Sequence, residues 1–224
     1  KVKLKFAKMT MALVIPMSSF RKTISNVFKN IKGLSSDMVI GPSDLAKKKY
    51  DLVIVDEGHR LRQRVNLGPY FKPFDITSKK FGLDKHTCSE LDWVLHQSNK
   101  CLIFYDRFQS IKPSDAPRER FVTLEKEKTT RVETLKSQFR SKGGINYVNF
   151  IHNLFDANIK VLFPFKSLDF DLRLFDNPED LVKEINLKER AEGLSRLVAG
   201  YAWEWISKKD KNKFDIKIGN VQLK

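Results

Sequence analysis

The chain has 224 residues, of which 41% are hydrophobic and 31% are charged, so it can bury the core of one large α/β domain or of one domain with part of a second. No apolar run approaches the roughly 20 residues that a membrane helix needs, which excludes a membrane-spanning protein and predicts no membrane partner. The formal net charge of +15 instead predicts a polyanionic partner, with DNA or RNA first and an acidic protein surface second.

The positive charge is concentrated near the start of the chain. Residues 1–50 contain eleven Lys and Arg but only two Asp, which is an excess of nine out of the total of fifteen. The alternative interpretation is a solubilising surface without a specific partner. We favour a nucleic-acid partner because the excess is large and unevenly distributed along the sequence.

The two cysteines, Cys88 and Cys101, have no metal-ligand spacing. They are predicted to be reduced thiols, as in a cytoplasmic protein. The four histidines also show no ligand spacing, so no metal site based on His or Cys is expected.

The first structural elements predicted are a strand and a helix. Met11–Ile15 is a short apolar run that is typical of a strand, and Pro16 ends it. Ser18 or Ser19 is expected to cap the helix that follows, whose apolar residues recur at helical spacing up to Ile31. A third apolar run, at residues 38–40, predicts another strand.

The stretch that organises the prediction is YDLVIVDEGHRL, residues 50–61. Leu52–Val55 is unbroken and apolar, which predicts a buried strand of a parallel sheet. Asp56 and Glu57 follow without a spacer, at the carboxyl end of the strand, where open α/β sheets bind ligands. One acid could hold a divalent cation while the other deprotonates a water molecule. Alternatively, Asp56 caps the next helix and Glu57 belongs to its first turn.

A second apolar strand is predicted at Cys101–Tyr105, and it also ends in polar residues, Asp106 and Gln109. Because parallel strands place their carboxyl ends on one edge of a sheet, we expect these residues to join Asp56 and Glu57. Gln109 could hydrogen-bond both an attacking water molecule and a terminal phosphate oxygen.

The remaining segments are predicted from the spacing of apolar residues and from the positions of proline, glycine and helix-capping residues. Residues 62–82 contain prolines and many polar residues, so an irregular excursion from the ligand edge is expected. Helices are predicted at residues 87–98 and 145–155, and a third begins at Asn177-Pro178 and ends at Gly193. Strands are predicted at residues 170–175, 197–205 and 214–218.

Four stretches taken together resemble a known class of enzymes. VIVDEGHRL, FYDRFQSIKPSD, LKSQFRSKGG and GLSRLVAGYAWEW occur in this order. They are similar to the signature stretches of the superfamily 1 helicase-like P-loop ATPases, and more closely of an uncharacterised bacterial family grouped with the Schlafen ATPase domain. The resemblance implies an α/β fold with a RecA-like parallel sheet flanked by helices. Residues 1–140 would be a truncated first lobe and residues 141–224 a partial second lobe.

The resemblance also implies roles for individual residues. Asp56 would hold Mg²⁺, Glu57 would be the general base for water, and Gln109 would contact the γ-phosphate. Arg140 would stabilise charge from the hinge between the lobes. His59 is hypothesised to connect the acid pair to Gln109. The residues assigned to nucleotide binding are Asp56, His59 and Asp106, and those assigned to a nucleic-acid backbone are Ser18, Ser19, Arg21 and Lys22.

Two departures from the family pattern affect the expected activity. None of the ten glycines begins a G-x-x-x-x-G-K-[ST] sequence, so the phosphate-binding loop is missing from these residues. No arginine follows Arg196, so the last helicase motif is missing as well. We therefore expect a fragment truncated at both ends, whose parent protein uses ATP and Mg²⁺ but which binds ATP weakly or not at all by itself.

Two other functions stay open at this point. A degenerate, nucleotide-free domain could serve as a nucleic-acid or protein binding module. A metal-dependent nuclease built on Asp56, Glu57 and Asp106 is less favoured, because nucleases usually gather more carboxylates and a lysine around a metal pair.

Overall fold

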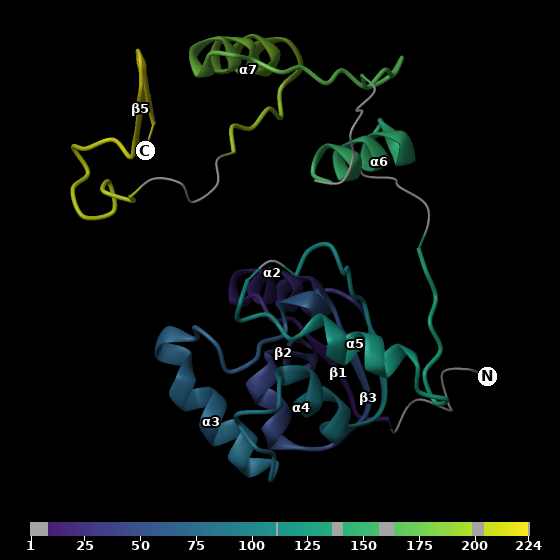
Figure 1. Cartoon of the computed structure of the whole chain (residues 1–224). Helices are drawn as coiled ribbons and strands as arrows, with labels where there is room; N and C mark the ends of the chain where they lie inside the picture. The colour runs from purple at the N-terminus through teal and green to yellow at the C-terminus, as the bar shows by residue number, and fades with distance from the viewer. Residues whose placement is uncertain (1–8, 111, 136–140, 157–163, 199–203, 224) are drawn as a thin grey trace. The chain divides into compact units, whose positions relative to one another are not determined.

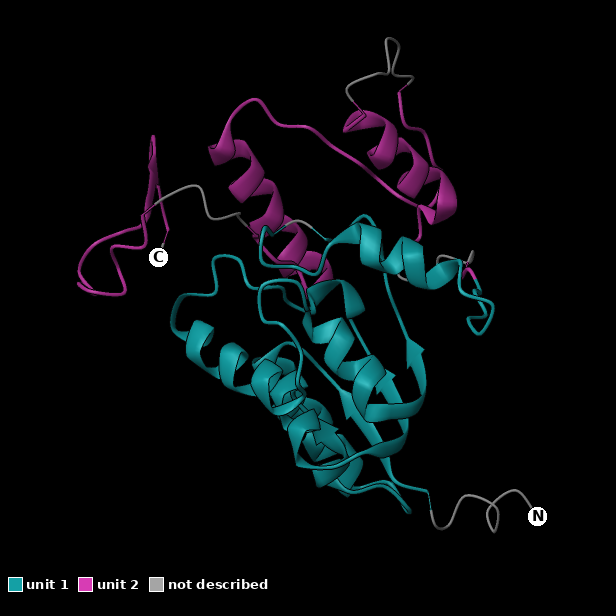
Figure 2. Ribbon diagram, turned by 60° about the horizontal axis from the view of Figure 1, so that its bottom comes forward, with its two compact units in different colours: residues 1–133 teal, residues 134–224 magenta. Residues whose placement is uncertain are grey.

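The computed structural model describes residues 9–110, 112–135, 141–156, 164–198 and 204–223 (Figure 1). The chain divides into two compact units, residues 1–133 and residues 134–224 (Figure 2). The predicted division after residue 140 falls in a stretch outside the described residues.

The first unit contains a parallel sheet of four strands. The strands are β1 (Met11–Val14), β2 (Val39–Ile40), β3 (Tyr50–Val55) and β4 (Ser98–Ile103), and their order is β2-β1-β3-β4. Both neighbours of β1 and both neighbours of β3 run parallel to them. The expected α/β class with a parallel sheet flanked by helices is therefore confirmed, and β4 lies at an edge.

One face of the sheet carries the core. Val14, Val55 and Ile103 lie side by side in the register of β1, β3 and β4, and the two valines are fully buried. Helices α3 (Phe71–Lys80), α4 (Glu90–Gln97) and α5 (Arg118–Glu125) contribute the side chains of the same hydrophobic core. On the opposite face, Ile54 is only half-buried and Leu102 is 50% exposed, so the expectation that β3 is buried on both faces is only partly correct.

The prediction of an irregular excursion at residues 62–82 is wrong. After the short 3₁₀ turn η4 (Gly68–Tyr70), α3 forms a regular helix there. Pro73 lies in the first turn of α3, where the missing N–H group has no intrahelical partner to lose. The buried ring of Phe74 packs against Trp93 of α4 at 4.7 Å between centroids, and this tertiary contact outweighs the polar composition.

Helix α2 (Ser18–Lys29) follows β1 as expected, but the predicted cap is wrong. Met17 occupies the capping position without a side-chain hydrogen bond, and both serines lie inside the first turn. The other short 3₁₀ turns described in this unit are η1 (Ser36–Met38), η2 (Pro42–Lys47) and η3 (Gly58–Arg60).

The second unit contains two helices and a hairpin among its described residues. These elements are α6 (Gly144–Leu154), α7 (Pro178–Glu192) and the antiparallel strands β5 (Ile216–Ile218) and β6 (Val221–Leu223). The predicted start of α7 is confirmed, because the Asn177 side chain accepts a hydrogen bond from the Glu179 N–H at 2.8 Å.

Two strand predictions in the second unit are not confirmed. The strand predicted at residues 170–175 is absent, and the ring of Phe170 packs instead against Tyr147 of α6, at 4.7 Å. The strand predicted at residues 197–205 lies partly outside the described residues, and those that are described form no strand.

Candidate functional site

The predicted acid pair lies where β3 leaves the sheet. The Asp56 N–H still donates a hydrogen bond to the Val14 carbonyl of β1 at 3.1 Å. The next residue, Glu57, has a φ of 55°, in the left-handed region that non-glycine residues rarely adopt. Such backbone strain often accompanies functional sites. Asp56 Oδ1 accepts a hydrogen bond from the Glu57 N–H at 3.0 Å, which holds the turn.

The turn after the acid pair contacts the end of β4 directly. The Gly58 N–H donates to the Phe104 carbonyl at 2.7 Å, and the Phe104 N–H donates to the Val55 carbonyl at 2.9 Å. A Cβ atom at Gly58 would lie 2.7 Å from Ile103 Cγ2 and 3.0 Å from the Phe104 oxygen. Glycine is therefore needed for this close approach. The expectation that the two acid-tipped strands are parallel neighbours is confirmed.

His59 links the two strand ends. Its ring is almost completely buried, and Nδ1 accepts a hydrogen bond from the Asp106 N–H at 3.3 Å. On the other side of the ring, Nε2 lies 3.0 Å from Glu57 Oε2, although the N–H group is not aligned for a hydrogen bond. Since Nδ1 is an acceptor, this network assigns the proton of the neutral ring to Nε2, which faces Glu57.

Asp106 organises the loop that carries Gln109. Its Oδ1 accepts from the Phe108 N–H at 2.9 Å, and its Oδ2 accepts from Gln109 Nε2 at 2.8 Å. Both carboxylate oxygens are thus engaged within the loop. The arrangement brings Gln109 to the same edge as Glu57 through the chain Gln109, Asp106, His59 and Glu57.

The other predicted site residues are less closely associated with the acid pair. Arg140 lies outside the described residues. Ser18, Ser19 and Lys22 are exposed on the first turns of α2, which leaves the carboxyl end of β1 and so begins at the same sheet edge as the acids. Arg21 is half-buried, and its Nη1 lies 4.0 Å from Asp44 Oδ2.

Sequence reasoning missed a buried glutamate that supports the site. Glu90 is 1% exposed, and its carboxylate accepts from the Arg62 N–H and from the Tyr70 hydroxyl, each at 2.9 Å. Tyr70 also hydrogen-bonds with the Ser43 hydroxyl. Burial raises the pKa of the Glu90 carboxyl to about 7. In the sequence, Glu90 resembles any acid in the first turn of a helix, so nothing in the sequence indicated that it is buried.

The segment that follows the acid pair is held from two sides. The Glu90 N–H donates to the Arg62 carbonyl at 2.7 Å, and the Ala116 N–H donates to the Leu61 carbonyl at 2.6 Å. Together with the Glu90 carboxylate, these bonds fix the direction in which the chain leaves Glu57 and His59. Glu90 therefore supports the acid pair indirectly, through its hydrogen bonds to the Arg62 backbone, and is not itself one of the two acids.

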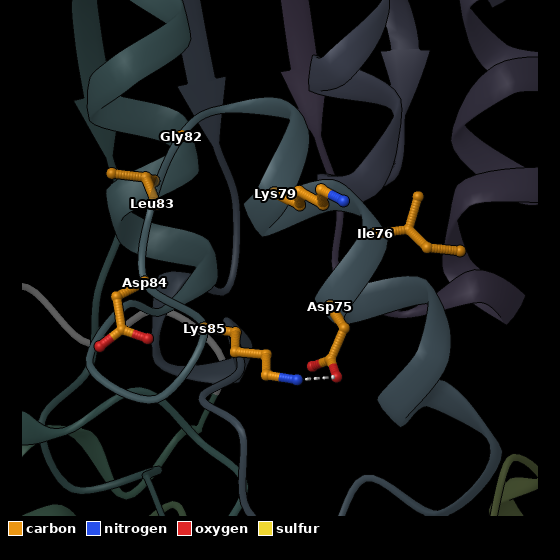
Figure 3. A pocket seen from close by; sticks show the side chains of 7 residues that line it. All are labelled: Asp75, Ile76, Lys79, Gly82, Leu83, Asp84 and Lys85. Carbon is orange, nitrogen blue, oxygen red and sulfur yellow. Dashed lines mark hydrogen bonds and ion pairs between the residues drawn. The ribbon is translucent and has the colours of Figure 1, made fainter.

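A hollow lies elsewhere in the first unit. Its volume is about 600 Å³, and it is lined by one side of α3 and by the turn that follows (Figure 3). Asp75 in this hollow is paired with Lys85 at 2.9 Å and with Arg64 at 2.6 Å, and these cations hold the pKa of its carboxyl well below the usual range. None of the predicted site residues lines the hollow. We favour the sheet edge as the functional site, because polar groups from several elements converge there.

The acids near the sheet edge are Asp56, Glu57 and Asp106. Across the described ranges, no group of three or more His, Cys, Asp and Glu is arranged to hold a metal ion. A single Mg²⁺ needs only one or two protein carboxylates when substrate phosphates supply other ligands.

Comparison with known proteins identifies the family. Residues 8–224 match the Schlafen group 3, DNA/RNA helicase domain family, and the chain belongs to this family. This confirms the resemblance to helicase-like proteins. No curated protein and no solved structure matches the chain. Within the part of the chain that the structure describes, no helix has both the length and the apolar character needed to cross a bilayer.

Proposed function

We propose that this chain is part of a nucleic-acid-dependent ATPase of the helicase-like class, which couples ATP hydrolysis to movement along, or remodelling of, DNA or RNA. The observation that carries the proposal is the acid pair at the carboxyl edge of a parallel sheet, joined to Gln109 of the neighbouring loop through His59. Membership of a helicase-domain family supports it. The four-stranded sheet would be the core of a RecA-like first lobe, and residues 141–224 would belong to a second.

Each residue of the edge has a proposed role. Asp56 would hold Mg²⁺, because no described residue donates a hydrogen bond to its Oδ2 and that oxygen can therefore face a cation. When bound, Mg²⁺ would neutralise charge on the phosphates of ATP. Glu57 would take the proton of the attacking water, and Gln109 would contact the γ-phosphate. Arg140 would add a positive charge from the hinge between the lobes.

His59 is proposed to couple the base to the phosphate-contacting loop. A shift of Gln109 on loss of the γ-phosphate would move Asp106, whose backbone N–H is bonded to the His59 ring. The ring would then change its position against Glu57, 3.0 Å away. His59 is the one buried member of this chain, and its contacts on both sides of the ring are what would relay the displacement.

A complete ATP site needs a phosphate-binding loop that residues 1–224 do not contain. The decisive experiment therefore uses the longer protein that includes both this chain and such a loop. We expect Glu57→Gln to lower the rate of ATP hydrolysis by about 10²- to 10⁴-fold while ATP binding is retained. Glu119→Gln, an exposed acid on α5, is the matched control. Hydrolysis at the wild-type rate in the Glu57 variant would disprove the assignment.

Two variants of His59 test whether the imidazole ring itself is needed for coupling. Asn in place of His59 keeps an acceptor for the Asp106 N–H but cannot reach Glu57, whereas Gln keeps a donor toward Glu57. If coupling runs through the ring, both variants lose the stimulation of hydrolysis by nucleic acid and keep most of the basal rate. Unchanged stimulation in both would exclude the coupling role.

The second candidate is a nucleotide-free binding module, which is favoured by the missing phosphate-binding loop and by the basic first fifty residues. Nucleic-acid binding would then fall steeply with salt and be unaffected by ATP. An effect of ATP on affinity in the longer protein supports the ATPase instead.

A further inference from the structure

The last part of the second unit presents a second basic surface. From Trp205 into the start of β5, the chain forms a turn that we call the lysine turn (residues 205–217). Its five lysines are all exposed, and only two aspartates accompany them. The lysines are Lys208, Lys209, Lys211, Lys213 and Lys217.

Both aspartates of the lysine turn serve its own backbone. Asp215 accepts hydrogen bonds from the Ser207 N–H at 2.7 Å and from the Ser207 hydroxyl at 2.5 Å, which ties the two ends of the turn together. Asp210 accepts from the Asn212 N–H at 3.0 Å. Asp210 Oδ2 also lies 3.9 Å from Lys213 Nζ. The acids therefore shape the turn and pair with one of its lysines, and five lysines against two aspartates leave its surface with a net positive charge.

The turn also presents an aromatic ring. Trp205 is 51% exposed, and the Lys208 Nζ lies 5.8 Å from the centre of its ring. An indole beside ammonium groups can stack on a nucleic-acid base while the cations contact the adjacent phosphates. Bases are accessible for stacking in single strands and are enclosed in duplexes.

The turn has an ordered support within its unit. The strands β5 and β6 follow it, and the Asp215 N–H donates to the Leu223 carbonyl at 2.9 Å. At the tip of this hairpin, the Asn220 N–H donates to Glu179 Oε1, near the start of α7, at 2.6 Å. A ligand would thus meet a preorganised loop, and binding would require little ordering.

We propose that the lysine turn is a binding site for single-stranded nucleic acid, in which a base stacks on Trp205 and the lysines contact the phosphates. This site is separate from the residues proposed on α2. It rests on the nucleic-acid part of the proposed function and is independent of ATP.

The test measures binding of the full chain to a fluorescent oligothymidylate or oligouridylate by anisotropy, without nucleotide. We expect Trp205→Ala to weaken binding by about 5- to 100-fold, the range for one lost stacking contact, and Trp205→Phe to recover most of it. Leu187→Ala on α7 removes a comparably exposed apolar side chain and is expected to bind like the wild type. A thermal unfolding curve confirms that each variant is folded.

A second variant tests the cations. Replacing Lys208, Lys211 and Lys213 by Gln should weaken binding and reduce the slope of log K against log salt by about 2, since each lost phosphate contact on a single strand contributes roughly 0.7. The control replaces Lys183 and Lys188, two exposed lysines of α7, and should leave the slope nearly unchanged.

Three results would overturn this site. The first is wild-type affinity in both Trp205→Ala and the triple lysine variant, even if substitutions on α2 abolish binding. The second is equal affinity for duplex and single strand. The third is tighter binding of polyglutamate or of phosphatidylserine vesicles than of the oligonucleotide. Loss of ATP hydrolysis in the longer protein, with these binding results intact, would count only against the ATPase proposal.

Discussion

The two units differ in what holds them together. Residues 1–133 bury a continuous hydrophobic core against one face of a parallel sheet. Among the described residues of the second unit, only Gly143 is buried, and large apolar side chains such as Leu174 and Leu194 are more than 90% exposed. Burial of apolar surface is the main stabilising term in folding, so the first unit can fix the acid pair precisely. The described part of the second unit has a helix cap, tied turns, a hairpin and a small cluster of partly exposed aromatic rings around Tyr147 and Phe170.

The sharpest test of this contrast is a core substitution. Trp93 is fully buried and contacts Phe74 and Phe81, at 4.7 and 6.1 Å between ring centroids. We expect Trp93→Ala to lower the free energy of unfolding by about 3–5 kcal/mol. Leu187→Ala, at a position 60% exposed on α7, should change it by no more than about 0.5 kcal/mol. Urea unfolding followed by circular dichroism measures both, and similar losses would refute the contrast.

The next effect concerns the buried carboxyl group of Glu90. Because the pKa of Glu90 is raised from 4.5 to about 7, the native state keeps a proton that the unfolded state releases. The free energy of unfolding should therefore fall as pH rises from about 5 to about 7, by up to about 3 kcal/mol. Glu90→Gln should remove this fall, since its amide can accept from the Arg62 N–H and donate to the Tyr70 hydroxyl. Urea unfolding at several pH values measures it.

Two comparisons isolate this pH dependence. The pKa of Asp75 is lowered by Arg64 and Lys85, so its contribution is present above the ordinary Asp range and is lost only as pH falls below about 4. It therefore lies outside the window of Glu90. Glu119→Gln, on the exposed side of α5, should leave the curve unchanged. A Glu90→Gln curve that stays parallel to that of the wild type from pH 5 to pH 8 would show that Glu90 does not titrate there.

The sequence was enough to predict most of the residues that the sheet brings to its carboxyl edge. Apolar runs and the rule for parallel strands were enough to place Asp56 beside the end of β4 and to locate Asp106 and Gln109. Those rules depend on local composition and on a general topological preference. They did not predict α3, because its stability comes from the contact of Phe74 with a residue far along the chain. Nor did these rules show how Asp106 differs from Asp56. Both carboxylate oxygens of Asp106 accept hydrogen bonds within its own loop.

Glu90 illustrates what a sequence pattern cannot show. Its carboxylate is buried by η4, α4 and the segment after His59, elements that lie far apart in the sequence. No periodicity or motif at Glu90 differs from that of a solvated first-turn acid. The contact between His59 and the Asp106 backbone is similar, because only the pairing of β3 with β4 brings the two together.

The smallest expected effect concerns the helix cap at the start of α7 in the second unit. Asn177→Ala removes the bond to the Glu179 N–H and should destabilise α7 by about 1 kcal/mol, whereas Asn177→Asp retains an acceptor. Asn186→Ala, an exposed site within the same helix, should stabilise it slightly, because Ala has the higher helix propensity. Amide hydrogen exchange along α7 measures both. If helix and core are held independently, the Asn177 variant accelerates exchange in α7 and leaves exchange in β3 unchanged. Equal acceleration in β3 would mean that the second unit supports the first.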